Sequence, residues 1–281
     1  MNWGEALEKA QDLLRAAGID SWKLDARLLL AHLEKQDVSV ISAFPERIIS
    51  DQRAYDAMII ERSNFKPVSH ILGYRDFWNL QFRVNENVLD PRPDSETLIE
   101  AVLDHFPDKA QALRIIDFGT GSGCLLLTLL SEYPNATGLG VDISSKALEI
   151  AEENAAILSL SKRAEFIKSD WDEFVSGKFD IVISNPPYIT SDDMRHLSKD
   201  VFNFEPHLAL HGGEDGLSPY RHLIPAAKNL LTPHGLLVFE FGYQQSESIE
   251  EMLNAAKFEN IKAYPDLSGI IRCLVARPPK T

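Results

Sequence analysis

The chain has 281 residues, of which 44% are hydrophobic and 25% are charged, and its formal net charge is −14. The length predicts about two domains, and the composition is that of an ordinary globular protein. The acidic balance weighs against nonspecific binding to nucleic acid, which depends on Lys and Arg side chains meeting phosphates. No apolar run approaches the roughly 18 residues that a membrane span requires.

The N-terminus and the cysteines bear on the cellular compartment. The first residues, MNWGEALEKAQ, are acidic and amphipathic, without the basic segment and apolar stretch of a signal peptide. Cys124 and Cys273 lie far apart and neither belongs to a CxxC pair, which predicts neither a disulfide framework nor a zinc site. We therefore expect a cytoplasmic protein.

Residues 1–75 have the spacing of helices and form a first predicted domain. Apolar residues recur at helical intervals up to a stop signal at Gly18. Ser21 is placed to cap a second helix, and a further helix is expected within residues 50–62. The pattern predicts a small helical bundle in which nothing has a catalytic character.

The period then changes. Residues 76–90 alternate as in a short β-hairpin, interpreted as the link to a second domain at residues 91–281. In that domain strand-like runs alternate with helices, which predicts right-handed βαβ units and a mostly parallel sheet, with an antiparallel last strand after IKAYP and a short loop. The runs are residues 114–118, 137–141, 164–168, 179–184, 235–241 and 271–276.

A glycine-rich loop follows the first of these strands. Residues 117–123 read DFGTGSG and lead into the apolar stretch CLLLTLL. Positions 124 and 126 lack the glycine of a dinucleotide fingerprint, and no GK[ST] follows, so neither that motif nor a P-loop is present. The remaining pattern, DxGxGxG after a strand, resembles motif I of class I S-adenosylmethionine (SAM) methyltransferases.

Polar residues also follow the next two strands. Asp142 ends the second strand, where a carboxylate can accept hydrogen bonds from both ribose hydroxyls or can instead cap the following helix. Asp170 and Trp171 follow the third strand, where the carboxylate can accept from an adenine amino group and the indole can cover the ring. Trp171 taken singly is also compatible with packing at a domain edge.

The fourth strand ends in Asn185-Pro186-Pro187-Tyr188. In doubly wound order this strand neighbours the first, so the turn is expected to face the glycine loop. A planar –NH2 carries two N–H donors, which the Asn185 side-chain oxygen and the Pro186 carbonyl can accept on a backbone restricted by proline. The fixed dipoles would stabilise positive charge that grows on the nitrogen during methyl transfer, and Tyr188 can stack on the acceptor group. By itself, the motif is also compatible with an ordinary tight turn.

With its flanking segments, the chain resembles the PrmC/HemK family of protein-(glutamine-N5) methyltransferases over nearly its whole length. One departure is Asp90, where the family usually has an apolar residue. The flanking segments are residues 62–97, which include Pro91-Arg92-Pro93, residues 204–221, residues 240–242 with Gln245, and residues 266–272.

The resemblance implies a class I SAM-dependent methyltransferase fold, with a seven-stranded, mostly parallel sheet and an antiparallel last strand, preceded by a helical substrate-recognition domain. It implies SAM as cofactor, S-adenosylhomocysteine as product, and the Gly-Gly-Gln glutamine of class I peptide chain release factors as substrate, with no nucleic-acid or membrane partner. The SAM contacts implied are Gly119, Thr120, Gly121, Ser122, Gly123, Asp142, Trp171 and Asn185, and the glutamine would be held by Asn185, Pro186, Pro187 and Tyr188.

Two other functions stay open. N6-adenine methylation of DNA or RNA would use the same turn, but it normally needs a basic groove, which the net charge of −14 disfavours. A non-catalytic SAM-binding protein on the same fold would be expected to have degraded motifs, whereas both are intact here. Glu205, His207 and His211 lack the spacing of a metal site and are expected in a loop that orders around substrate.

Overall fold

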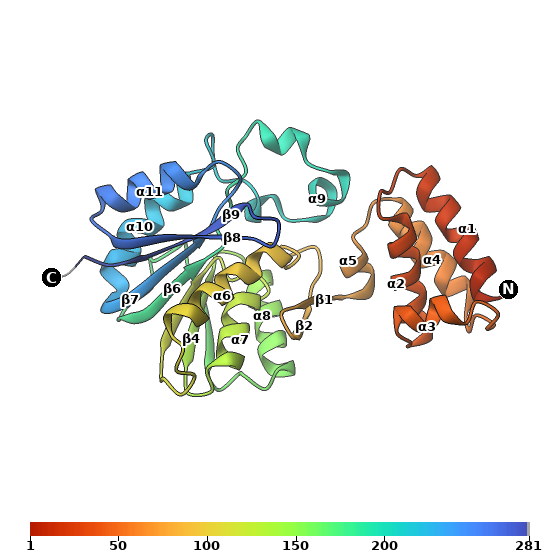
Figure 1. The fold of residues 1–281 in the computed structure, drawn as a ribbon, viewed down its shortest axis with the longest axis horizontal. Coiled ribbons are helices and arrows are strands. Elements are labelled where there is room, and N and C mark those ends of the chain that lie inside the picture. The colour runs from red at the N-terminus through yellow and green to blue at the C-terminus, as the bar shows by residue number, and fades with distance from the viewer. Residues whose placement is uncertain (280–281) are drawn as a thin grey trace. The chain divides into compact units, whose positions relative to one another are not determined.

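The computed structural model describes residues 1–279 and contains two compact units (Figure 1). The helical unit comprises Met1–Tyr74 and Ser198–Phe204, and the sheet unit comprises Arg75–Leu197 and the chain from Glu205 onward. Residues 198–204, which we place in the second domain from the sequence, are thus grouped with the first. Within the described residues, no helix combines the length and the apolar character that crossing a bilayer demands.

The helical unit is built from short amphipathic helices around one apolar core. The first helix begins with a capping box, in which the Asn2 side chain accepts from the Glu5 N–H and the Glu5 side chain accepts from the Asn2 N–H. It ends at the predicted stop, where Gly18 has a φ of 82°. The helices are α1 (Trp3–Ala16), α2 (Trp22–Glu34), α3 (Val38–Ala43), α4 (Gln52–Ser63), α5 (Val68–Leu72) and α9 (Lys199–Phe204).

The predicted cap at Ser21 is wrong in its chemistry. Ser21 does precede α2, but its side chain makes no capping bond, and its hydroxyl donates to Asp25 Oδ2 at 2.7 Å. Asp25 also accepts from Arg62 Nε at 2.7 Å, and both of these charged side chains are buried. A buried carboxylate is stable only when it is paired and hydrogen-bonded. The Ser21 hydroxyl therefore donates to the Asp25 carboxylate and does not accept an N–H at the start of α2.

The sheet unit holds the predicted hairpin and a seven-stranded sheet. In the sheet, β3 to β7 run parallel to one another, and β9 is antiparallel to both β7 and β8, which confirms the predicted fold class. The strand order is β5-β4-β3-β6-β7-β9-β8. The strands are β1 (Tyr74–Phe77) and β2 (Leu80–Arg83) of the hairpin, then β3 (Arg114–Phe118), β4 (Thr137–Asp142), β5 (Ala164–Lys168), β6 (Phe179–Ser184), β7 (Leu231–Glu240), β8 (Glu259–Pro265) and β9 (Ile271–Arg277).

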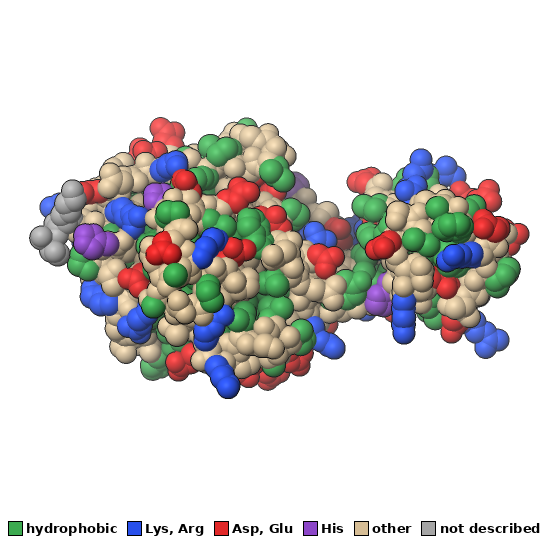
Figure 2. Space-filling model, turned by 60° about the horizontal axis from the view of Figure 1, so that its bottom comes forward, with side chains coloured by type: hydrophobic (Ala, Val, Ile, Leu, Met, Phe, Trp, Pro, Cys, Tyr) green, Lys and Arg blue, Asp and Glu red, His purple; other side chains and the backbone are tan. Residues whose placement is uncertain are grey.

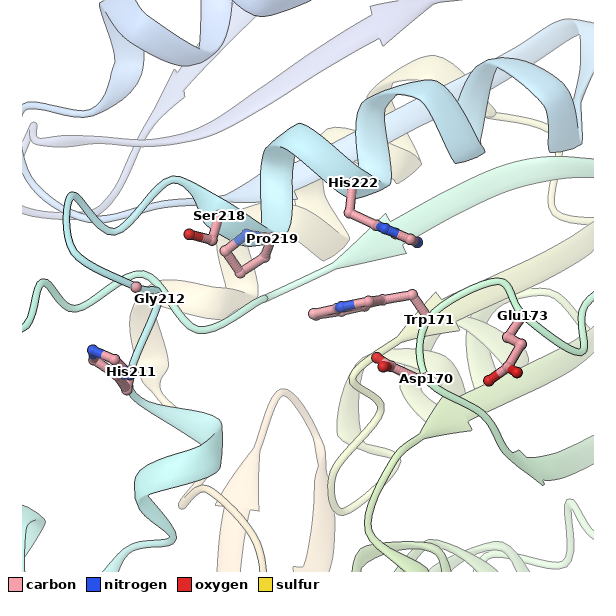
Figure 3. Close-up of a pocket in the computed structure, with 9 residues that line it drawn as sticks. Asp170, Trp171, Glu173, His211, Gly212, Ser218, Pro219 and His222 are labelled. Atoms are coloured by element: carbon pink, nitrogen blue, oxygen red, sulfur yellow. The ribbon is translucent and has the colours of Figure 1, made fainter.

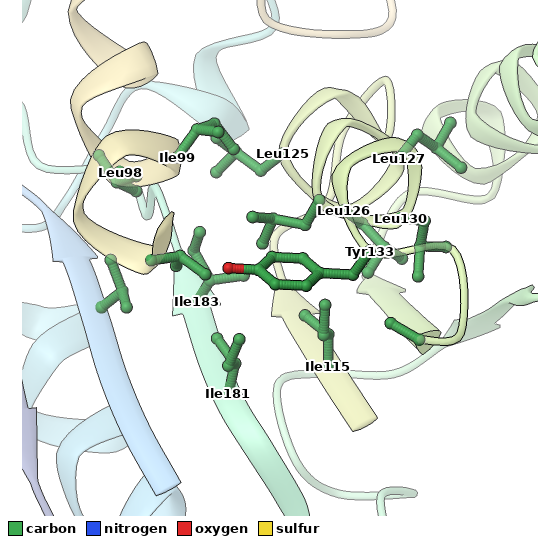
Figure 4. Close-up of a cluster of buried hydrophobic side chains, with 14 of the residues drawn as sticks. Leu98, Ile99, Ile115, Leu125, Leu126, Leu127, Leu130, Tyr133, Ile181 and Ile183 are labelled. Atoms are coloured by element: carbon green, nitrogen blue, oxygen red, sulfur yellow. The ribbon is translucent and has the colours of Figure 1, made fainter. Parts of the chain in front are cut away.

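Helices cover both faces of this sheet. On one face α6, α7 and α8 pack with Ile115 around the fully buried Tyr133 (Figure 4), and on the other α10 and α11 pack with Ile116 and Phe239. Successive strand residues point to opposite faces, so a sheet covered on both sides requires the continuous apolar runs seen in the sequence. The helices are η1 (Pro93–Ser95), α6 (Glu96–His105), α7 (Cys124–Glu132), α8 (Ser145–Ile157), η2 (Asp193–His196), η3 (His207–Ala209), α10 (Ser218–Leu230) and α11 (Ser246–Ala255).

Candidate active site

The strands β3 and β6 end side by side. Phe118 of β3 is paired in register with Ser184 of β6, and the Ser184 hydroxyl donates to the Phe118 carbonyl oxygen at 2.6 Å. The glycine loop at residues 119–123 and the turn at residues 185–188 therefore start from neighbouring positions, as predicted. They lie at the carboxyl ends of the strands, where open α/β sheets bind their ligands.

Main-chain N–H groups of the glycine loop donate hydrogen bonds to β4. The Gly119 N–H donates to the Val141 carbonyl oxygen at 2.8 Å, and the Gly121 N–H donates to Asp142 Oδ2 at 3.0 Å. The φ angles of Gly119 and Gly121 are 69° and 55°, a region that disfavours side chains. A Cβ on Gly119 would meet no atom within 4 Å, and one on Gly121 would meet only the Gly119 oxygen, at 4.0 Å. Both glycines line a cavity of about 240 Å³, so their missing side chains keep that space open.

This cavity lies between the glycine loop and the turn, and some of the predicted site residues line it. Those that line it are Gly119, Gly121, Asp142, Trp171, Asn185 and Pro187. Those that are not among its lining residues are Thr120, Ser122, Gly123, Pro186 and Tyr188. Thr120 and Ser122 are buried within the loop. A Cβ on Gly123 would come within 3.1 Å of Leu127, so this glycine permits close packing of the loop on α7.

Two carboxyl groups beside the loop have different surroundings. Asp142 accepts the Gly121 N–H on Oδ2 and the Ser144 N–H on Oδ1 at 2.9 Å, and the Ile143 N–H also bonds this carboxylate. The N-cap of α8 is Ser144, so Asp142 does not cap that helix. Asp117 is fully buried and accepts from Thr120 Oγ1 at 2.7 Å. Burial raises the pKa of Asp117 to about 7 and also raises the pKa of Asp142.

Trp171 borders a second cavity of about 670 Å³ next to the first. Its indole ring lies between Asp170 and His222 in Figure 3, with the Trp171 and His222 ring centroids 6.3 Å apart. The φ of Trp171 is 50°, an unusual value for a bulky residue. His222 Nε2 lies 2.7 Å from Asp172 Oδ1, which anchors the imidazole beside the indole. Trp171 lines both cavities and also packs against the core between the sheet and α10.

Side chains from distant segments hold the turn. Asn185 Nδ2 donates to Ser95 Oγ at 3.1 Å, and Ser95 Oγ donates to Glu240 Oε2 at 2.5 Å. The Tyr188 hydroxyl donates to Glu240 Oε1 at 3.4 Å, and Gln245 Nε2 donates to the Tyr188 carbonyl oxygen at 3.0 Å. Burial raises the pKa of Glu240 to about 7. Sequence reasoning gives Ser95 and Glu240 no role, although Glu240 carries a signal: it is an acid that directly follows the apolar run at residues 236–239.

The chain after the turn comes back to it. Ile189 forms an isolated parallel bridge with His211, and the Gly212 N–H donates to the Ile189 carbonyl oxygen at 2.9 Å. A Cβ on Gly212 would lie 2.7 Å from the Tyr188 Cα, so glycine is needed for this approach. His211 thereby reaches the cavity wall.

Arg92 has an ion-pair partner in the same returning segment. Its Nη2 lies 2.6 and 2.8 Å from the two carboxylate oxygens of Glu205, whose side chain is only 2% exposed. This pair ties the Pro91-Arg92-Pro93 segment to the chain that follows the turn. The structure thus defines a contact for Arg92, which lies two residues after Asp90, the position where the sequence departs from the family.

Comparisons with known proteins first define the class. Residues 92–214 match the family model of the methyltransferase small domain, and residues 5–73 match that of the PrmC N-terminal domain. Among solved structures, the N-terminal domain of human METTL16 in complex with SAH is similar in fold, with a TM-score of 0.55 and 17% identity over 78% of this chain and 83% of that one. The sheet order and the glycine loop are those of a class I methyltransferase.

Full-length relatives then define the family. A release factor glutamine methyltransferase from Rhodospirillum rubrum is 41% identical over 276 residues, which cover 98% of this chain and 84% of the relative. One from Caulobacter vibrioides is 42% identical over 267 residues, which cover 94% of this chain and 92% of the relative. The chain belongs to the release factor glutamine methyltransferase family, which confirms the resemblance found in its sequence.

Proposed function

We propose that this protein transfers a methyl group from SAM to the side-chain amide nitrogen of the Gly-Gly-Gln glutamine in class I peptide chain release factors. The observation that carries the proposal is the cavity shared by the glycine loop, Asp142 and Asn185. Its chemistry fits a nucleoside-bearing methyl donor on one side and a planar amide on the other. The full-length relatives named as release factor glutamine methyltransferases supply the class of substrate.

The residues around the cavity fit SAM. The Asp142 carboxylate lines the cavity and would accept from the ribose hydroxyls, and the open faces of Gly119 and Gly121 admit a ligand close to the backbone. Asp170 and Trp171 would bind the adenine by hydrogen bonding and by contact with the indole face. When bound, SAM supplies a methyl group on a positively charged sulfur.

The turn fits the amide of a glutamine. Asn185 Oδ1 and the Pro186 carbonyl oxygen would each accept one N–H of the substrate amide, which directs the nitrogen toward the methyl carbon. Positive charge grows on the nitrogen as the new bond forms, and these oriented dipoles stabilise it. As the methyl group passes from sulfur to nitrogen, S-adenosylhomocysteine would leave as a neutral thioether, and the methylated nitrogen would release one of its two protons along its hydrogen bond to solvent water, without a separate general base.

A single cavity can recognise one side chain, so the body of a release factor needs another surface. We assign that role to the helical unit, which corresponds to the PrmC N-terminal domain model over residues 5–73. Nucleic acid is disfavoured as a direct partner by the net charge of −14. On the face drawn in Figure 2, Lys and Arg side chains are dispersed among Asp and Glu, without the basic stripe typical of nucleic-acid binding.

The test is methyl transfer from labelled SAM to a purified class I release factor, either wild type or with its Gly-Gly-Gln glutamine replaced by Ala. We expect label on the wild-type factor and none on the variant. Label that does not depend on this glutamine, or transfer to single-stranded DNA or RNA in its place, would overturn the proposal.

A further inference from the structure

The two ends of an Asn side chain have nearly the same shape, so neighbouring groups decide which end faces a ligand. For Asn185 this choice matters, because a substrate –NH2 needs an acceptor, and a second –NH2 facing it would leave both sets of donors unsatisfied. Within residues 1–279, Asn185 Oδ1 accepts no hydrogen bond, while Nδ2 donates to Ser95 Oγ. The oxygen is thus the end left for the cavity that Asn185 lines.

Ser95 occupies a place where serine ordinarily caps a helix. It is the N-cap residue of α6, yet its side chain makes no capping bond there. Instead its hydroxyl lies between Asn185 and Glu240, and both Ser95 and Glu240 are almost fully buried, at 3% and 1% exposed. Because the Ser95 hydroxyl contacts Asn185 and Glu240 and not the N–H groups of α6, we infer that it serves the turn at residues 185–188.

The direction of these hydrogen bonds follows from the charge of Glu240. An ionised carboxylate can only accept, so it draws the single hydroxyl proton of Ser95 toward Oε2. The Ser95 oxygen is then left with acceptor lone pairs alone, and Asn185 can satisfy them only by presenting Nδ2. A protonated Glu240 would donate to Ser95 instead, and the serine proton could then turn to Asn185 and reverse its amide.

We propose that Glu240 and Ser95 are positioning residues, which form a buried relay that keeps the side-chain oxygen of Asn185 directed at the substrate nitrogen. The inference rests on the proposed function, since it assigns a purpose to the orientation of Asn185. The relay also reaches Tyr188, whose hydroxyl donates to the other Glu240 oxygen. One buried carboxylate from β7 thereby holds both ends of the turn.

The relay makes turnover depend on the ionisation of Glu240. Burial raises the pKa of Glu240 to about 7, so the ionised form required by the relay is lost as pH falls through neutrality. We expect kcat to rise with pH across that range. The charged and titratable groups around this carboxyl are Asp94 of η1, Cys124 of α7, Tyr188 of the turn, Tyr220 of α10, and Arg272 and Cys273 of β9.

The experiment compares kcat and its pH profile in Ser95→Ala, Ser95→Thr and Glu240→Gln, together with the Kd for SAM. We expect Ser95→Ala to lower kcat by about tenfold or more with the Kd nearly unchanged, and Ser95→Thr to restore activity because it keeps the hydroxyl. Glu240→Gln should lower kcat and remove the acid limb of the profile, since an amide no longer dictates the direction of the relay. Ser131→Ala is the matched control, because its hydroxyl bonds only within α7.

Wild-type kcat in a folded Ser95→Ala variant would overturn the relay, and so would an acid limb that persists in Glu240→Gln. If Ser95→Ala fails to fold, the pH profile of Glu240→Gln decides by itself. Failure of the proposed function is seen separately, as a wild-type protein that does not methylate the release factor glutamine. A wild type that methylates beside an unaffected Ser95→Ala variant would refute the relay alone.

Discussion

The glycine loop after β3 and the turn after β6 lie at the same edge of the sheet, yet they are held by different means. The loop is fixed locally, by main-chain bonds to Val141 and the Asp142 carboxylate on the adjacent strand. The turn is fixed from a distance, by Ser95, Glu240 and Gln245. This difference matches their proposed tasks, because a cofactor needs space and backbone donors, whereas a reacting nitrogen needs side-chain atoms in one orientation.

If the division is correct, damage to the turn should reduce turnover, and damage to the loop should reduce cofactor affinity. Asn185→Ala has the largest expected effect, a fall in kcat of about 10²- to 10³-fold, because it removes a dipole aimed at the developing charge. The Kd for SAM, measured by calorimetry, should change little. Asn135→Ala is the matched control, since its amide only donates to the Ala110 carbonyl in an exposed loop. Unchanged methyl transfer by Asn185→Ala would refute its role.

Asp142→Ala tests the other side of the comparison. A charge-assisted hydrogen bond to the ribose is worth about 1.5–3 kcal/mol, so the loss of even one of them should raise the Kd for SAM by at least roughly 10- to 100-fold. At saturating SAM, kcat should stay near the wild-type value. Asp108→Ala, which removes an exposed carboxylate that accepts from the Ala110 N–H, provides the control. A loss of kcat without a change in Kd would place Asp142 with the turn instead.

A third prediction concerns stability and Asp117. Its pKa is raised from 3.8 to about 7 by burial, so between about pH 4 and pH 7 the folded state keeps a proton that the unfolded chain has released. The free energy of unfolding should therefore fall as pH rises through that window. Asp117→Asn removes this term and should be more stable than wild type at pH 8 by about 2–4 kcal/mol, with no such gain at pH 4. Urea unfolding at both pH values measures the difference, and parallel stability curves for the two proteins would contradict it.

The smallest effect is expected from Tyr188→Phe. The bond from the Tyr188 hydroxyl to Glu240 Oε1 is long, at 3.4 Å, so its loss should lower kcat only about two- to fivefold. The Kd for SAM should remain at its wild-type value. An effect as large as that of Asn185→Ala would mean that the Tyr188 phenol itself contacts the substrate. Tyr188 would then join Asn185 among the turn residues that act on the reacting amide.

The features of the fold and of the glycine loop that could be predicted from the sequence depend on residues close together in the chain. The adjacency of β3 and β6 and the antiparallel last strand follow from apolar period and chain order, and both are confirmed. The glycine pattern could be recognised because the glycines and the strand before them are contiguous in sequence, and the hydrogen bonds from Gly119 and Gly121 go to the end of the next strand. Asp142 could be placed at that strand end for the same reason.

The supports of the turn could not be read in this way. Ser95 is separated from Asn185 by 90 positions and from Glu240 by 145. No local period encodes contacts over such distances, and a serine before a helix predicts a cap, which it does not form here. Ser21 misleads for the same reason, since a buried carboxylate competes for its hydroxyl. Serines near helix starts are thus poor evidence of capping when an acid lies within their reach.

The grouping of α9 with the helical unit bears on modularity. The chain passes from one unit to the other after residues 74, 197 and 204, and Lys199 Nζ of α9 lies 4.6 Å from the Phe65 ring centroid. The helical unit is therefore a discontinuous domain, assembled from two separate stretches of the gene. A chimera that exchanged residues 1–74 alone between two family members would join a foreign bundle to a resident α9, so transplanting the specificity of this unit requires both stretches to move together.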